Sequence, residues 1–180
     1  AQGPVGLDPA AAEALGVNSV VADEVKQALK HSRPGTCPGA DGIPVELYRK
    51  LGQPMVQLLA RLYSAMGETN STPPNFLDGV ISSIYKSGDP TLPANYRPIT
   101  LLNTDYRILA KVLANRCLQH IPHLISSEQC AFLKGRNIGD SIMLLQLLPH
   151  QLAVEHHRGA LVAFLDFRKA YDSVNREFLR

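Results

Sequence analysis

Hydrophobic residues first recur at a helical spacing between Ser19 and His31. The apolar positions that fall on one face of such a helix are Val21, Val25, Ala28 and Leu29. Acidic side chains come early in this segment and lysines come late, as the helix dipole favours. The pattern therefore predicts an amphipathic helix over residues 19–31, after a small-residue lead-in over residues 1–18.

The next segment, SRPGTCPGADGIP (32–44), is dense in proline and glycine and predicts a loop with tight turns. Pro44 and Pro54 each suit the first turn of a helix, where the missing N–H has no partner to lose. We therefore expect two short helices, VELYRKL and MVQLLARLYSAM.

The pattern of residues then changes from one typical of helices to one typical of β-strands. Residues 79–86 and 95–102 are rich in β-branched and aromatic side chains, and SGDP lies between them as a turn. This predicts a β-hairpin with one basic residue on each arm, Lys86 and Arg97. Its connecting loop is long and polar enough to move.

Two further helices are predicted in the second half of the chain. Asn103 or Thr104 is a suitable cap for a helix over residues 104–121, whose cations lie off the apolar face and give a positive field: Arg107, Lys111 and Arg116. Another helix spans 137–157, with Pro149 as a site for a kink. An apolar strand, ALVAFLDF (160–167), then closes the pattern.

The composition indicates how charge is distributed along the chain and which compartment and metal sites are plausible. The net charge is +2, and the middle third (86–136) is the basic part, with seven basic and three acidic side chains. The cysteines, Cys37, Cys117 and Cys130, are scattered and odd in number, which favours a reducing, intracellular compartment, nucleus or cytoplasm. Cys117, His120, His123 and Cys130 are a weak zinc hypothesis, because Pro122 should end the helix between the histidines. No apolar run is long enough to predict a membrane span.

The strand predicted at 160–167 raises a chemical question, because its apolar run stops at Asp166. A carboxylate placed there is costly unless it is paired or bound to a metal. In one interpretation it lies in a turn and pairs with Lys169 or Arg97. In the other it is a metal ligand, because two-metal phosphoryl transfer needs carboxylates beside the ions and basic groups on the phosphates. The backbone carbonyl of Phe167 is then a second candidate oxygen ligand.

Four segments in series carry a family resemblance: PGADGIPVELYRKL (38–51), ANYRPITLLNTDYRILAKVLANR (94–116), EQCAFLKGRNIGDSI (128–142) and FLDFRKAYDSV (164–174). In this order they resemble the reverse transcriptase of non-LTR (LINE-type) retrotransposons. The resemblance covers about residues 20–180. It implies an α+β fold, with helix-rich fingers bearing a β-hairpin (19–158) and the first strand of a right-hand polymerase palm (159–180).

The resemblance also implies roles for individual residues. Asp166 matches the first catalytic aspartate, which binds Mg²⁺ (or Mn²⁺), and Tyr171 matches the aromatic gate under the incoming sugar. Lys86 and Arg97 match the basic pair that grips the triphosphate. Arg136, in LKGR, matches a second basic motif near template and nucleotide.

The implied partners are an RNA template, a DNA primer and deoxynucleoside triphosphates. Together with Arg136, Lys111 and Lys134 are the candidate contacts to nucleic acid, mainly to its backbone. The sequence ends at Arg180 without the aromatic-x-Asp-Asp motif that supplies the other metal carboxylates in this family. We therefore expect the isolated 180-residue chain to lack polymerase activity. The alternative is a relic or a domesticated RNA-binding module that keeps the fingers surface without catalysis.

Overall fold

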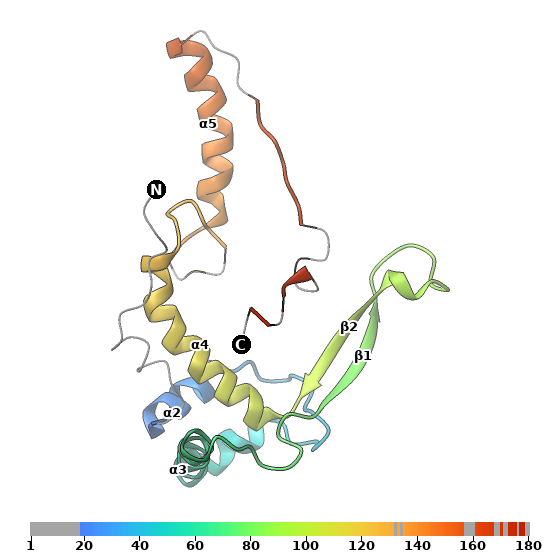
Figure 1. Ribbon diagram of the computed structural model, residues 1–180, viewed down its shortest axis with the longest axis vertical. Coiled ribbons are helices and arrows are strands. Elements are labelled where there is room, and N and C mark those ends of the chain that lie inside the picture. The colour runs from blue at the N-terminus through green and yellow to red at the C-terminus, as the bar shows by residue number, and fades with distance from the viewer. Residues whose placement is uncertain are drawn as a thin grey trace. The chain divides into compact units, whose positions relative to one another are not determined.

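The computed structural model describes residues 19–131, 133, 135–156, 161–167, 170, 173–175 and 177–178 (Figure 1). It divides into two units, one through Ser126 and one from Ser127 onward. The expected lead-in lies outside the described residues. The observed mixture of helices and an antiparallel β-hairpin confirms the predicted α+β class.

Three helices form the core of the first unit: α2 (Ala22–Lys30), α3 (Val45–Thr69) and α4 (Thr104–Leu124). The expected pair of short helices is present within α3, because Gly52 interrupts it with φ 62° and ψ −139°. These angles suit glycine, which has no Cβ. Pro54 then lies in the first turn of the second part, as its fixed φ favours. The helix ends at Thr69 and is followed by its C-cap, Asn70, a left-handed residue with φ 47°.

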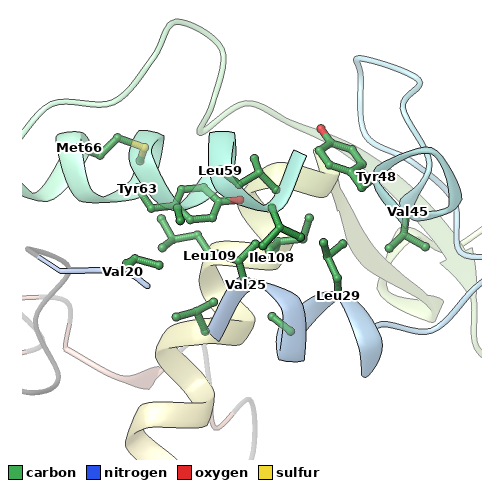
Figure 2. Close-up of a cluster of buried hydrophobic side chains, with 14 of the residues drawn as sticks. Val20, Val25, Leu29, Val45, Tyr48, Leu59, Tyr63, Met66, Ile108 and Leu109 are labelled. Atoms are coloured by element: carbon green, nitrogen blue, oxygen red, sulfur yellow. The ribbon is translucent and has the colours of Figure 1, made fainter. Parts of the chain in front are cut away.

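The three helices bury one apolar cluster, shown in Figure 2. Tyr63 from α3 and Val25 from α2 are completely buried, and Ile108 from α4 is 1% exposed. The Tyr63 hydroxyl donates a hydrogen bond of 2.8 Å to the carbonyl of Asp105, so its polar end is satisfied inside the core. Burial raises the pKa of Tyr63 well above its ordinary value, and that of the less buried Tyr48 to about 12.

Strands β1 (Gly79–Tyr85) and β2 (Tyr96–Leu102) form the predicted antiparallel hairpin. Their register pairs Gly79 with Leu102 at the base and Tyr85 with Tyr96 at the tip. A short 3₁₀ helix, η1 (Pro93–Asn95), lies in the connecting loop. In Figure 1 the hairpin extends away from the helices of its unit, and β1 is exposed along its whole length.

The base of the hairpin is fixed to the proline- and glycine-rich loop by Asn103. This residue occupies the N-cap position of α4, as predicted, but its side chain makes no capping hydrogen bond. Instead its Oδ1 accepts from the backbone N–H of Asp41, at 3.3 Å, and its Nδ2 donates to the carbonyl of Asn75, at 3.4 Å. Gly39 lies so close that a Cβ there would collide with Asn103. The buried amide therefore joins two loops.

The second unit contains α5 (Ile138–His156), close to the predicted 137–157, with Pro149 inside the helix. The predicted strand at 160–167 is not observed, because residues 161–167 have no strand assignment and are exposed. A strand needs hydrogen bonds to a neighbour, and the described residues provide no partner here. The earlier prediction that Pro122 ends its helix is also wrong, since α4 continues to Leu124. Within the described part of the chain, no helix combines the length and apolarity that crossing a membrane requires.

Candidate functional site

The hairpin brings together the two basic residues that the sequence placed on its arms. Arg97 lies opposite Ile84. Lys86 is the first residue after β1, two positions beyond Ile84, and its N–H donates to the carbonyl of Asn95 at 2.8 Å, which continues the strand pairing by one residue. Directly paired residues, and residues two apart, point to the same face of an antiparallel sheet. Lys86 and Arg97 therefore share one face near the tip. Both are exposed, and neither forms an ion pair with any residue that the structure describes.

The loop at the tip is closed by its own hydrogen bonds, which the sequence did not predict. Asp89 accepts from the backbone N–H and the hydroxyl of Thr91, at 2.9 and 2.7 Å, and these bonds lower the pKa of its carboxyl. The amide of Asn95 donates to the Asp89 carbonyl at 2.8 Å. The acidic group nearest the basic pair in sequence is thus engaged within the loop. This leaves Lys86 and Arg97 available to an anionic ligand.

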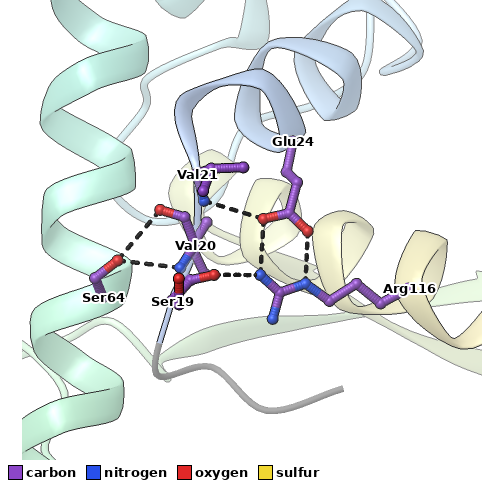
Figure 3. Close-up of polar contacts among 6 residues, drawn as sticks. All are labelled: Ser19, Val20, Val21, Glu24, Ser64 and Arg116. Carbon is purple, nitrogen blue, oxygen red and sulfur yellow. Dashed lines mark hydrogen bonds and ion pairs between the residues drawn. The ribbon is translucent and has the colours of Figure 1, made fainter. Parts of the chain in front are cut away.

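Arg116, one of the cations expected to give α4 its positive field, is engaged in an ion pair instead (Figure 3). Its Nε and Nη2 donate to the two carboxylate oxygens of Glu24, at 2.6 and 2.7 Å, and Nη2 also donates to the carbonyl of Ser19. Glu24 accepts as well from the N–H of Val21. The hydrogen bond to Arg116 is the main reason that the pKa of Glu24 is lowered. Arg116 therefore ties α4 to the start of α2, and its charge is compensated.

The other two cations on α4 have no such partner. Arg107 and Lys111 are one helical turn apart and half-buried, and neither has a carboxylate partner among the described residues. Arg107 instead donates to two hydroxyls, those of Thr36 and Thr104. Three cations were predicted to give this helix a positive field. Of these, Arg107 and Lys111 have charges that no described carboxylate compensates.

In the second unit, Arg136 takes part in a local contact. Its Nη1 donates to the carbonyl of Gln129 at 2.7 Å, across the turn that contains the positive-φ Gly135. This bond holds the loop before α5. Lys134, its predicted companion in nucleic-acid binding, lies outside the described residues.

The predicted metal ligands lie in the exposed segment 161–167. Asp166 and Phe167 are both exposed, and Tyr171 lies outside the described residues. Among the residues that the structure describes, no group of three acidic, histidine or cysteine side chains could hold a metal ion. One exposed carboxylate does not form a two-metal site, so the described residues do not provide a complete magnesium site.

Two residues that position the Arg107 side chain were not predicted as site residues from the sequence. Thr36 in the loop and Thr104 at the start of α4 hold the guanidinium of Arg107, at 3.3 and 3.0 Å. Thr104 is 2% exposed and donates its own hydrogen to the carbonyl of Ile43 at 2.6 Å. A helix-starting threonine is ordinarily read as a cap. Its placement against an arginine depends on the loop fold and has no local sequence signal.

Comparison with known proteins places the chain in a family. The model of the family "Reverse transcriptase (RNA-dependent DNA polymerase)" matches residues 84–180, more than half of the sequence. The match begins in β1 and includes Lys86, Arg97 and Asp166. The chain therefore belongs to the reverse transcriptase family.

The chain is also similar to proteins of several transposable elements. An uncharacterized 149 kDa protein of transposon TX1 from Xenopus laevis is 30% identical over 162 residues, which are 89% of this chain and 12% of that protein. The RNA-directed DNA polymerase from mobile element jockey of Drosophila melanogaster is 27% identical, covering 89% of this chain and 18% of that protein. The Pol polyprotein of the type-1 retrotransposable element R2 from Nasonia vitripennis is 26% identical, covering 84% and 14%.

These relatives confirm the resemblance to non-LTR reverse transcriptases that the four motifs carry. The matched proteins are much longer than this chain, which spans between 12% and 18% of the three named relatives.

Proposed function

We propose that these residues are the fingers (19–158) and the start of the palm (159–180) of an RNA-directed DNA polymerase from a non-LTR retrotransposon. The observation that supports this most directly is the pair Lys86 and Arg97, exposed on one face of the hairpin. Two cations near each other and without carboxylate partners suit a triphosphate, which carries several negative charges.

The incoming deoxynucleoside triphosphate would lie against this face of the hairpin. Arg97 can donate two N–H groups to one phosphate, while Lys86 acts as a compact charge on its neighbour. Tyr171 would pack under the sugar and disfavour a ribonucleotide. This assignment needs no carboxylate from the hairpin loop, where Asp89 is already engaged with Thr91.

Asp166 and the Phe167 carbonyl would be ligands of Mg²⁺ or Mn²⁺ in the complete polymerase. A metal bound there would supply charge stabilisation for the pyrophosphate leaving group. Since the described residues do not complete such a site, we derive no catalytic step through it. Lys111, Lys134 and Arg136 would contact the RNA template or DNA primer through the backbone.

The test is nucleotide incorporation by a polypeptide that carries these residues within a complete polymerase domain. Lys86→Met and Arg97→Met should each raise the KM for deoxynucleotides about 10- to 100-fold, since a charge-assisted hydrogen bond contributes about 1.5–3 kcal/mol. Lys50→Met, which removes an exposed lysine from α3, is the matched control and should leave KM unchanged.

Two further measurements complete this test. Asp166→Asn should lower the rate about a thousandfold or more, because the metal contributes several kcal/mol. The 180-residue chain by itself should give no magnesium-dependent primer extension. Unchanged kinetics in both hairpin variants would refute the nucleotide site. RNA binding without any incorporation that Asp166→Asn abolishes would favour a non-catalytic RNA-binding module.

A further inference from the structure

A cavity of about 240 Å³ lies where the end of α2, the proline- and glycine-rich loop and the first turns of α4 meet. A water molecule's share of liquid volume is about 30 Å³, so the space can hold an oxyanion with part of its hydration. Its lining side chains are basic, hydroxylic or apolar, and none of them is acidic. The arginine and lysine groups come from two segments of the sequence: Arg33 from the loop, and Arg107 and Lys111 from α4.

Arg107 is fixed in this cavity wall by neutral partners. Its Nη1 donates to the Thr36 hydroxyl at 3.3 Å and its Nη2 to the Thr104 hydroxyl at 3.0 Å. Both hydroxyls pass their own hydrogens on, to the carbonyls of Arg33 and Ile43. The threonine oxygens are therefore oriented as acceptors toward the guanidinium. They hold the side chain in one position but do not neutralise its charge.

The same helix provides an internal comparison for this arginine. Arg116 is also partly buried, and it forms two hydrogen bonds to a carboxylate. Among the described residues, Arg107 has no carboxylate partner. Its Nε is buried, and no described residue forms a hydrogen bond with it. Burying a charge without a counter-charge is costly. An anion bound in the cavity would reduce that cost.

We propose that this cavity binds a phosphate of the nucleic-acid backbone, through Arg107, Lys111 and Arg33. This inference rests on the proposed function, because it takes the ligand from the polymer that a reverse transcriptase copies. Lys111 and Arg33 supply further positive charge, and the fixed guanidinium of Arg107 supplies a planar donor. The contact carries no base recognition, so it would bind RNA irrespective of sequence and would weaken with salt.

The first test compares RNA binding by three forms of the 180-residue chain. They are the unmodified chain, Arg33→Gln/Lys111→Gln, and Lys50→Gln as a control for the loss of surface charge outside the cavity. Arg107 is left intact because it holds the loop to α4. For a ten-nucleotide uridine RNA, the double variant should lower the slope of log K against log salt by about 1.4, since each single-strand phosphate contact contributes about 0.7.

The affinity of the double variant for this RNA should fall about tenfold at low salt. The affinity of Lys50→Gln should stay close to that of the unmodified chain. An unchanged slope in the double variant, or no measurable RNA binding by the chain, would overturn the proposal. An equal fall in Lys50→Gln would do so too, because the effect would then be general surface charge.

The second test uses inorganic phosphate as the probe, at constant ionic strength with chloride as the reference. Phosphate should raise the midpoint of thermal unfolding of the unmodified chain and of Lys50→Gln, but not that of the double variant. It should also compete with the uridine RNA. Protection without competition would mean a site for free phosphate and would overturn the nucleic-acid assignment.

The outcomes also separate this cavity from the nucleotide site. If cavity variants leave RNA binding unchanged while Lys86→Met and Arg97→Met raise KM, the cavity proposal alone fails. If RNA binding falls as expected and the hairpin variants polymerise normally, the nucleotide site fails and the phosphate site stands.

Discussion

The ion pair between Glu24 and Arg116 gives the sharpest prediction about stability. The Arg116 side chain is 12% exposed and that of Glu24 is 28% exposed, and two charge-assisted hydrogen bonds join them. An exposed pair contributes about 0.2–1 kcal/mol, and breaking a fully buried pair costs about 3–5 kcal/mol. The geometry lies between these limits. We expect Glu24→Gln and Arg116→Met each to lower the free energy of unfolding by about 2 kcal/mol.

The double variant should lose less unfolding free energy than the two single variants lose in sum, with a coupling energy of about 1.5 kcal/mol. Urea unfolding measures this, and with a slope near 2 kcal/mol per molar each single loss shifts the midpoint by about 1 M. The chain has no tryptophan, and five of its six tyrosines precede residue 127. Tyrosine fluorescence therefore reports mainly on the unit that contains the ion pair.

The pH dependence of this coupling has a definite sign. The folded pKa of Glu24 is lowered, chiefly by its hydrogen bond to Arg116, from an ordinary value of 4.5. The contribution is therefore complete above that ordinary value and is lost as the pH falls through the lower folded pKa. Coupling should be present at pH 7 and should weaken only as the pH falls below 4.5. Losses that add within about 0.3 kcal/mol at pH 7, or a coupling that already weakens on going from pH 7 to pH 5, would refute the reasoning.

Two further predictions concern the core and the loop contact. Gly39→Ala places a methyl group against Asn103 and should cost about 3 kcal/mol by overpacking, whereas Gly42→Ala, with open space but φ +68°, should cost only about 1–2 kcal/mol of strain. Equal losses in urea unfolding would contradict the close approach. Tyr63→Phe should cost about 1 kcal/mol, because it removes the hydrogen bond from a buried hydroxyl to the Asp105 carbonyl, and Tyr85→Phe on the exposed hairpin should cost less. The reverse order in thermal unfolding would count against the burial argument.

Local signals predicted much of the fold. Pro44 and Pro54 marked the starts of the two helical parts of α3, and the change to β-branched residues marked the hairpin. The placement of one basic residue on each arm of the hairpin, Lys86 and Arg97, also followed from the local sequence. These features are determined within short stretches of chain.

The errors arose where structure depends on distant partners. The apolar run 160–167 has the composition of a strand, but it forms no ladder in the described structure. Arg116 was predicted to contribute to the positive field of its helix, but it is paired with Glu24, which lies 92 positions away. Asparagine commonly caps helices, but the side chain of Asn103 joins two loops instead. Its partners Asp41 and Asn75 come close to it only in the folded chain. Neither residue type nor spacing contains such information.

The attachment of the hairpin has a mechanical consequence. Its base is held where Gly39 meets Asn103, while Lys86 and Arg97 lie toward the opposite end. Seven residues per strand at about 3.4 Å each make a lever of about 20 Å, so a rotation of about 10° at the base would move the tip by about 3.5 Å. That displacement is larger than a hydrogen-bond length. A substitution at Gly39 can therefore misplace the two tip cations without touching either of them.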